Sequence, residues 1–132
     1  MMISSKGRYL LLVLIDLAKH ADHGYIPMKD VAQRQNLSLK YLERILPTLS
    51  KNDVIIGLQG KGGGYRLRRS PAEYTLGEIL RLAEGSLSPV PCLENKAKAC
   101  EHAAECRTLP IWTKLDSIVN EYLDSLLLSD LL

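Results

Sequence analysis

The sequence predicts a mainly α-helical fold with a small β-hairpin wing: a winged helix-turn-helix domain followed by a long C-terminal helix. Three observations lead to this prediction. Two short amphipathic segments flank a tight turn at 36–38, two short apolar segments flank the Gly-rich sequence QGKGGG at 59–64, and a broad apolar stripe runs through 110–132. Together they indicate a small helical bundle that carries one hairpin.

The composition is that of one globular domain. The 132 residues are 46% hydrophobic and 24% charged, and because Phe is absent we expect a core of Leu, Ile and Val. The longest apolar run, 9–18, is interrupted by Asp16 and is shorter than the roughly 20 residues that span a bilayer. It also lacks a secretory cleavage site, so we expect a cytoplasmic protein with no membrane partner and with reduced cysteines.

The first helix is expected to begin near residue 6 and to end at the sequence HADHG, residues 20–24. Ser4 or Ser5 can cap its N-terminus, and Gly24 suits the position after its C-terminus. We interpret the two histidines of its last turn as helix-end residues rather than metal ligands. Apolar residues occupy two faces, which should both be covered: Leu10, Leu14, Leu17 and Ala21 on one, and Leu11, Ile15 and Ala18 on the other.

Residues 26–53 have the pattern of a helix-turn-helix pair. Val31 and Ala32 give a short helix its apolar side, the sequence QNLS turns the chain, and Ser38 can cap a second helix. Pro47 should kink or shorten this second helix. Its inward residues are expected to be Leu39, Leu42, Ile45 and Leu46, and its outward residues Lys40, Tyr41, Glu43 and Arg44. Such a pair is typical of DNA-binding proteins.

Two short strands, 54–58 and 65–68, are predicted around the Gly-rich loop. Glycines permit positive φ and a close approach of the backbone to another surface. The loop lacks the spacing of a nucleotide-binding P-loop and no helix follows it directly, so we favour a DNA-contacting wing. The wing residues expected to contact DNA are Gln59, Lys61, Gly62, Gly63 and Arg66.

Basic residues are concentrated in this part of the chain. Residues 36–70 carry seven basic and two acidic side chains, whereas the whole chain has a formal net charge of +2. The excess favours a surface that binds the phosphates of double-stranded DNA over an ordinary solvated face. The seven are Lys40, Arg44, Lys51, Lys61, Arg66, Arg68 and Arg69. The residues expected nearest the bases are Ser38, Lys40, Tyr41, Glu43 and Arg44, with Glu43 discriminating between bases.

The C-terminal third should contain two more helices. Thr75 and Glu78 form a capping-box pattern for a short helix that closes at Gly85, and Pro110 suits the first turn of a long terminal helix. The apolar stripe of the long helix is too wide for one small core, so we expect a homodimer that packs through it. The predicted dimer interface comprises Ile111, Leu115, Ile118, Tyr122 and Leu126.

All three cysteines lie between these two helices, in the sequence CLENKAKACEHAAEC at 92–106. Thiols clustered in so polar a segment of a cytoplasmic protein are typical of a metal or redox site. We therefore divide the chain into a DNA-binding domain at 1–85, a cysteine loop at 86–109 and a dimerisation helix at 110–132.

Several motifs resemble those of the Rrf2 family of winged-helix transcriptional regulators, which includes IscR, NsrR and CymR. They are SSKGRY near the N-terminus, SLKYLERIL in the second helix of the pair, GKGGGYRL in the wing, LGEIL, the three cysteines, and IW before the terminal helix. The resemblance covers residues 3–132. It implies a homodimeric regulator, expected to be a repressor, that binds pseudo-palindromic promoter DNA and carries an iron–sulfur cluster in its cysteine loop.

Carried over to this chain, the resemblance makes Cys92, Cys100 and Cys106 the thiolate ligands of the cluster. Thiolates are the soft donors that iron–sulfur clusters use. We expect a [2Fe-2S] cluster, with [4Fe-4S] as the alternative and zinc as a further alternative.

The fourth ligand departs from the family pattern. The histidine that IscR-like members supply is replaced by Leu109, and the acidic residue of NsrR-like members is replaced by Arg8. His102 is the best remaining donor, and the other candidates are Glu101, Glu105 and an exogenous thiol.

Three other functions are weighed against this one. A thiol-redox or zinc-responsive regulator of the same fold, with a CymR-like role in sulfur metabolism, would need no cluster. An enzyme with a cysteine nucleophile is disfavoured, because the loop has one histidine and no obvious orienting partner, so we expect no catalysis and no small-molecule substrate. A scaffold that uses the winged domain for protein contact would lack salt-dependent DNA affinity.

Overall fold

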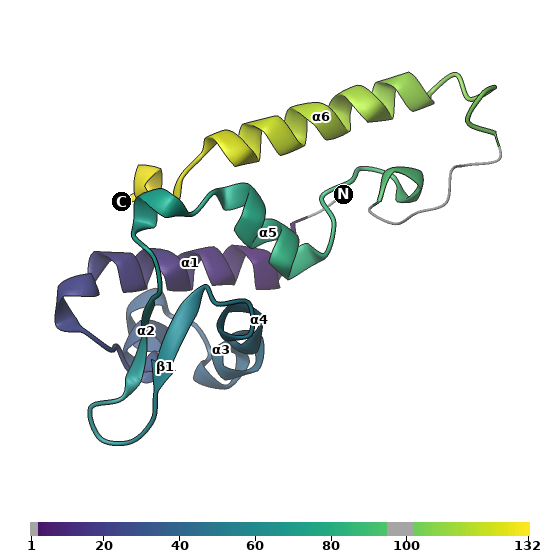
Figure 1. Ribbon diagram of the computed structural model, residues 1–132. Coiled ribbons are helices and arrows are strands. Elements are labelled where there is room, and N and C mark those ends of the chain that lie inside the picture. Colours follow the sequence, from purple (N-terminus) through teal and green to yellow (C-terminus); the bar gives the residue numbers. More distant parts are fainter. Residues whose placement is uncertain (1–2, 95–101) are drawn as a thin grey trace.

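The computed structural model describes residues 3–94 and 102–132 of the protein. The mainly helical architecture with one hairpin and a C-terminal helix (Figure 1) confirms the predicted fold class. No helix within the described residues is long and apolar enough to cross a membrane. The elements are, in order, α1 (Ser5–Lys19), η1 (Ala21–His23), α2 (Met28–Gln35), α3 (Leu39–Ile45), α4 (Pro47–Ser50), β1 (Ile55–Leu58), β2 (Gly64–Leu67), η2 (Pro71–Glu73), α5 (Leu76–Glu84), η3 (Pro91–Leu93), α6 (Leu109–Ser125) and η4 (Leu128–Leu131), where η marks a 3₁₀ turn.

The central helix of the molecule is α1, which lies between α5 on one side and α2, α3 and β2 on the other (Figure 1). Its N-terminus is capped as predicted, because the Ser4 hydroxyl accepts a hydrogen bond of 3.2 Å from the Gly7 N–H. The helix ends at Lys19, so Ala21 lies in η1 and is exposed, and its predicted place on the buried face is wrong. The buried residues of α1 are Gly7, Leu10, Val13, Leu14, Asp16 and Leu17.

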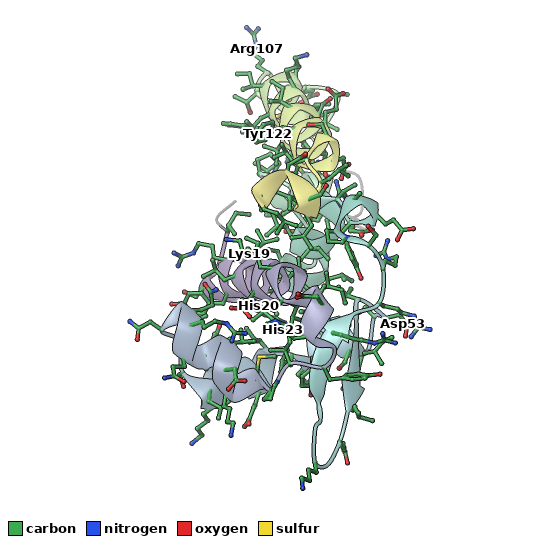
Figure 2. The ribbon with its side chains drawn as sticks, turned by 90° about the vertical axis from the view of Figure 1, so that its left-hand side faces the viewer. Lys19, His20, His23, Asp53, Arg107 and Tyr122 are labelled. Carbon is green, nitrogen blue, oxygen red and sulfur yellow. The ribbon has the colours of Figure 1, made fainter. Side chains whose placement is uncertain are left out.

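The end of α1 carries the two histidines. Figure 2 shows His20 and His23 beside each other there, with ring centres 5.7 Å apart. His20 Nδ1 lies 2.8 Å from the carbonyl oxygen of Asp16, which is one of the last carbonyls of the helix. Gly24 has a φ of 75° and closes η1 rather than α1.

The helix-turn-helix pair consists of α2 and α3, joined through Asn36, whose left-handed φ of 54° turns the chain. The Ser38 hydroxyl caps α3 by accepting from the Tyr41 N–H at 3.2 Å. Pro47 shortens α3, as predicted, and is also the first residue of a further short helix, α4, which was not predicted. Leu42, Ile45 and Leu46 are buried as expected, whereas Leu39 is 38% exposed because the buried stripe begins only after the first turn of α3.

The wing is an antiparallel hairpin in which Ile55 pairs with Leu67 and Leu58 pairs with Gly64, within one residue of the predicted strands. Ile26 extends this sheet, since its N–H and carbonyl exchange hydrogen bonds of 2.8 and 2.9 Å with Tyr65. Gly64 has a φ of 151°, and a Cβ at this position would collide with the carbonyl of Ile26. A glycine is therefore required where the hairpin passes this close to the backbone.

The C-terminal helix is shorter than predicted, because α6 ends at Ser125 and the chain then folds back onto the core. The carbonyl of Leu126 accepts from the Leu76 N–H, and the Leu128 N–H donates to the Tyr74 carbonyl, both at 2.9 Å. Leu128 is fully buried. Leu126 is half-buried and lies outside the helix, so its predicted place on the exposed stripe of α6 is wrong.

Tyr74 joins the end of the wing to the start of α5. Its ring is fully buried, and its hydroxyl donates to the Val54 carbonyl and accepts from the Arg69 N–H, both at 2.7 Å. The Arg69 guanidinium covers the ring at 4.1 Å and also donates to Glu78 at 2.8 Å. A single hydroxyl thus satisfies two backbone groups that lie in different elements.

Asp16 is the one charged side chain that is buried within the described residues, with 1% of its surface exposed. Its carboxylate accepts hydrogen bonds from Arg34 Nη2 at 2.7 Å, Arg34 Nε at 3.0 Å and Gln35 Nε2 at 3.1 Å. Burial alone would raise the pKa of Asp16, but the hydrogen bonds from Arg34 and Gln35 and the Arg34 charge outweigh it, so the pKa lies below its ordinary value of 3.8.

We expect Tyr74→Phe to lower the free energy of unfolding by about 2 kcal/mol. The Arg69 N–H loses its hydrogen-bond acceptor, and the Val54 carbonyl loses one of its two hydrogen-bond donors. Urea unfolding followed by circular dichroism measures this. Tyr122→Phe is the matched control: Tyr122 is 62% exposed, so its hydroxyl should be dispensable. Equal stability of the two variants would contradict the role given to Tyr74.

We expect Asp16→Asn to lower the free energy of unfolding at pH 7 by about 2 kcal/mol, because the buried carboxylate loses its charge-assisted hydrogen bonds with Arg34. Since the folded-state pKa of Asp16 is lowered, the stabilisation should be complete above about pH 5 and should be lost as the pH falls through and below 3.8. Urea unfolding of both proteins between pH 3 and 7 tests this: the difference in stability should shrink only at the acid end. A difference that stays constant down to pH 3 would contradict it.

Candidate nucleic-acid interface and cysteine loop

The recognition helix α3 and the hairpin lie at the end of the molecule away from α6 (Figure 1). Of the residues predicted on α3, Tyr41 is half-buried and Ser38, Lys40, Glu43 and Arg44 are exposed. Together, Ser38, Lys40, Tyr41 and Arg44 line a shallow pocket on the surface of the helix. The structure therefore brings four of the five predicted base-reading residues together at one pocket, which Glu43 does not line.

Aromatic rings orient two of the arginines on this face. Tyr41 packs edge-on against Tyr9 of α1, with ring centres 5.6 Å apart, and the Arg44 guanidinium lies 5.8 Å from the Tyr41 ring. In the wing, the guanidinium of Arg66 lies 5.1 Å from the ring of Tyr25. Cation–π contacts of this kind restrict the arginine side chains without neutralising them.

The wing tip carries Gln59, Lys61 and Gly62 in exposed positions, with Gly63 half-buried. The Gly63 N–H donates to the Gly60 carbonyl at 3.0 Å, which closes the turn. Gly62 has a φ of 78°, a conformation that glycine adopts without strain. The turn thus holds Lys61 at the outermost part of the hairpin.

Two of the seven predicted basic residues are engaged within the protein. Arg68 lies 3.6 Å from the Asp53 carboxylate, and Arg69 is bound to Glu78 and Tyr74. The other five are exposed and form the basic surface, which we define as Lys40, Arg44, Lys51, Lys61 and Arg66.

Sequence reasoning missed the supporting residues of this surface, Tyr9 and Tyr25. Neither lies in the helix-turn-helix pair or in the wing, and each contacts its partner across a large gap in sequence. The one local signal is that both are aromatic residues in a chain in which aromatic residues are few.

The described end of the cysteine loop, next to α6, lies at the other end of the molecule, where Figure 2 shows Arg107 far from the hairpin. Cys92 is exposed in η3, and Cys106 is half-exposed shortly before α6. Cys100 and Glu101 lie outside the described residues. His102 and Glu105 are exposed. Within residues 3–94 and 102–132, no three of the His, Cys, Asp and Glu side chains are grouped so as to hold a metal ion.

The environment of Cys106 suits a thiolate. Its sulfur lies 3.4 Å from the Thr108 hydroxyl, and hydrogen bonds from this hydroxyl and from the backbone at Thr108 and Leu109 lower the pKa of the thiol. The donor chemistry of the two described cysteines therefore fits an iron–sulfur cluster, which takes accessible thiolates as ligands.

The two positions that depart from the family pattern hold no donor for iron. Leu109 begins α6, and its side chain is aliphatic. Arg8 is exposed on α1, where its guanidinium donates to the Ser5 hydroxyl at 3.1 Å.

The helix α6 presents an apolar stripe to solvent. Ile111 is 57% exposed and Ile118 is 50% exposed, and the remaining exposed members of the stripe are Leu115 and Tyr122. A continuous set of large apolar side chains at helical spacing is typical of a protein–protein interface.

Comparison with known proteins agrees with this geometry. The model of the Rrf2 family, described as an iron-dependent transcriptional regulator, matches residues 3–132. The HTH-type transcriptional regulator IscR of Aliivibrio salmonicida is 33% identical over 132 residues, which are 100% of this chain and 77% of that protein.

Two solved structures of transcriptional regulators are similar to this chain over almost its whole length. CymR, the global cysteine regulator of B. subtilis, is 35% identical with a TM-score of 0.82, and the match covers 99% of this chain and 95% of that one. The T. potens IscR structure is 32% identical with a TM-score of 0.77, over 99% of this chain and 85% of that one. Since these relatives are regulators, the prediction that the chain is not an enzyme is confirmed. The chain belongs to the Rrf2 family and is a DNA-binding transcriptional regulator of the IscR and CymR type.

Proposed function

We propose that the protein is a homodimeric repressor that binds pseudo-palindromic promoter DNA and is controlled by an iron–sulfur cluster in its cysteine loop. The observation that carries the proposal is the two-ended arrangement of the molecule. The α3 helix and the hairpin, which carry most of the basic surface, lie at one end, whereas Cys106 lies at the other end, shortly before the helix with the exposed apolar stripe.

DNA binding would place α3 in the major groove. Lys40 and Arg44 supply positive charge for bases and phosphates, and the exposed Glu43 accepts from cytosine but repels phosphate, which favours some sequences over others. Lys61 at the wing tip, with the neighbouring Gln59 and Gly62, would contact the backbone or the minor groove. Two copies related by a dyad would bind half-sites about one helical turn apart.

Dimerisation would bury the apolar stripe of α6 against a second copy. A partner helix that covers the exposed Ile and Leu residues of α6 stabilises the dimer by roughly 25 cal/mol for each Å² of apolar surface buried. Packing through α6 leaves α3 and the wing free at the far end of each subunit. Such a dimer presents two recognition helices to one face of the DNA.

The cluster would be held by Cys92, Cys100 and Cys106, with His102 or an exogenous thiol as the fourth donor. When bound, it would supply sensitivity to iron supply, oxidants or nitric oxide, through its redox chemistry and its lability. The chain's own contribution is the short connection from Cys106 to Leu109, the first residue of α6. A change in the order of the loop therefore acts on the dimerisation helix directly, and a few kcal/mol between the two states suffices for a switch.

A second candidate function is a thiol-redox or zinc-responsive regulator without a cluster. The similarity to CymR and the absence of a donor at Leu109 and Arg8 favour it. The two functions share the fold and the DNA surface, and they differ in what the cysteines hold.

Anaerobic purification separates these two functions. We expect brown protein with visible absorption and stoichiometric iron and sulfide, because three thiolates grip the cluster. Cys92→Ala and Cys106→Ala should each lose the colour, whereas Ser117→Ala, on the surface of α6, should keep it. Colourless protein that contains zinc, or that contains no metal, would refute the cluster and leave the second candidate.

Salt-dependent DNA affinity tests the basic surface. We expect Lys61→Gln to reduce the slope of log affinity against log salt concentration by about 1.8, because each of the two subunits of the bound dimer loses one phosphate contact worth about 0.9. Fluorescence anisotropy with a labelled duplex, selected from random-sequence DNA by the unmodified protein, gives the slope. Lys114→Gln removes the same charge from an exposed position on α6 and should leave the slope unchanged. Equal slopes for the two variants would contradict the assignment of Lys61.

A further inference from the structure

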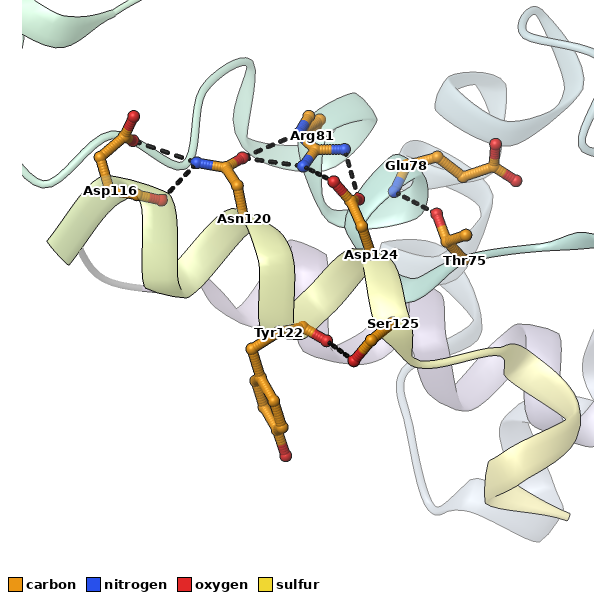
Figure 3. A network of polar contacts seen from close by, with 8 residues as sticks. All are labelled: Thr75, Glu78, Arg81, Asp116, Asn120, Tyr122, Asp124 and Ser125. Carbon is orange, nitrogen blue, oxygen red and sulfur yellow. Dashed lines mark hydrogen bonds and ion pairs between the residues drawn. The ribbon is translucent and has the colours of Figure 1, made fainter. Parts of the chain in front are cut away.

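One arginine makes all the described polar side-chain contacts between α5 and α6 (Figure 3). Arg81 donates from Nη1 and Nη2 to the two carboxylate oxygens of Asp124, each at 2.8 Å. It also donates from Nε and Nη2 to the amide oxygen of Asn120, at 3.2 and 2.8 Å. The guanidinium thus holds two residues that are one turn apart on α6, and this fork geometry restricts direction as well as distance. We call this contact the Arg81 clamp.

The acceptors of the clamp are themselves held in place. The Asn120 amide nitrogen donates to the backbone carbonyl of Asp116 at 2.8 Å and to its carboxylate at 3.1 Å, which turns the amide oxygen toward Arg81. Hydrogen bonding to Arg81 lowers the pKa of Asp124, and hydrogen bonding to Asp124 raises the pKa of Arg81, so both groups are charged at neutral pH. The clamp is therefore a preorganised ionic contact.

A glycine allows the Asp124 carboxylate to approach α5 closely at the clamp. A Cβ built on Gly77 of α5 would collide with the Asp124 carboxylate. Gly77 is buried in the first turns of α5, one turn before Arg81. The carboxylate of Asp124 consequently lies against the α5 backbone while Arg81 grips it from the side.

The clamp and the apolar stripe occupy opposite sides of α6. Since each residue of a helix turns by about 100°, Asn120 and Asp124 face away from Ile118 and Tyr122. Figure 3 shows Tyr122 pointing away from Arg81. The side of α6 opposite the clamp is therefore the side that the proposed dimer would bury.

The C-terminal end of α5 is fixed to the DNA-binding domain. Glu84 accepts from the backbone N–H of Ser4 at 3.0 Å and from its hydroxyl at 2.6 Å, at the N-terminus of α1. A Cβ on Gly7 of α1 would lie only 3.3 Å from Leu80, so α1 and α5 are also in close contact. Because α3 packs on α1, the clamp completes a continuous path of packed helices from α6 to the recognition helix.

We infer that Arg81 is a positioning residue that fixes the direction of α6 relative to the DNA-binding domain, and so sets the separation of the two recognition helices. The inference rests on the proposed dimer. With the clamp intact, two DNA-binding domains joined through α6 form one rigid body, which accepts one spacing of half-sites. Without it, each domain can swing about the main-chain contact at 126–128, and the dimer tolerates several spacings.

The experiment compares half-site spacings. A duplex selected from random-sequence DNA by the unmodified protein is made again with one base pair inserted or removed at its centre. Each change rotates one half-site by about 34° relative to the other. We expect the unmodified protein to lose affinity at least about tenfold, and Arg81→Ala to lose less than about threefold, because the swinging domains follow the rotation. Sedimentation and thermal unfolding of each protein are recorded in parallel.

Three further variants sharpen the test. Gly77→Ala should reproduce the relaxed spacing, because it displaces Asp124 by an independent route. Arg81→Lys retains the charge but not the fork, so its discrimination should lie between those of the unmodified protein and Arg81→Ala. Glu121→Gln is the matched control: it removes a carboxylate from an exposed position on α6 that is bonded to Ser117 and not to α5, and it should retain full discrimination.

The possible outcomes distinguish failure of the inference about Arg81 from failure of the proposed dimer. If Arg81→Ala remains a folded dimer and discriminates spacings as sharply as the unmodified protein, the clamp does not position the domains and the inference fails alone. If Arg81→Ala dissociates into monomers, the inference also fails, because the clamp then serves association rather than alignment. If the unmodified protein sediments as a monomer, the proposed dimer fails.

Discussion

The buried carboxylate of Asp16 is the constraint that orients the DNA-binding end of the molecule. Packing between apolar faces is not directional, so apolar contacts with α1 alone would not fix the position of the helix-turn-helix pair along α1. Asp16 removes this freedom, because its two oxygens accept from both Arg34 and Gln35 at the end of α2. The turn at Asn36 and the cap of α3 follow directly, so the position at which α2 ends determines where the recognition helix begins.

The same logic recurs at the other end of the molecule. There α6 meets α5 across a small residue, Gly77, and a fork of hydrogen bonds from Arg81 gives the contact a direction. In both places a charged side chain hydrogen-bonds to a residue of another helix, and this contact fixes the angle between the two helices, which apolar packing alone does not fix. The two groups differ in burial, since Asp16 is 1% exposed and Asp124 is 46% exposed. The first is thus suited to hold the fold permanently, and the second to hold an arrangement that can be altered.

Most of the fold was predictable because its signals are local. The caps Ser4, Ser38 and Thr75, the break at Pro47 and the Gly-rich turn of the wing each act within a few residues and appear as expected. The predicted capping box is only half formed, because the Glu78 side chain accepts from Arg69 instead of the Thr75 N–H. The end of α6 was predicted wrongly because the apolar residues of 126–132 suit a helix, and nothing local shows that Leu126 and Leu128 pair with Leu76 and Tyr74. The hydrogen-bond partners of Asp16 and Arg81 could not be predicted either, because they lie far away in the sequence. On the DNA surface, the exposed basic residues were found from charge density, whereas the internal engagement of Arg68 and Arg69 depends on tertiary contacts.

The location of the clamp along α6 determines how the cysteine loop can act on the DNA-binding end. The helix is rigid, and Leu109 lies about 16 Å from Asn120 at 1.5 Å per residue. A sideways shift of about 3 Å at the loop end therefore turns α6 by about 10°, and a closed clamp makes α5 turn together with α6. Because α6 would be packed against its mate, that rotation appears as a movement of α5 and of everything attached to it, including α3. Arg81 is well suited to this role, because its planar guanidinium restricts the angle between α5 and α6. An exposed ion pair of this kind nevertheless breaks at a small cost in free energy, which a change in the loop can supply. In the proposed regulator, the strength of the clamp, rather than the strength of the dimer contact, would thus decide whether a change at Cys106 reaches the DNA.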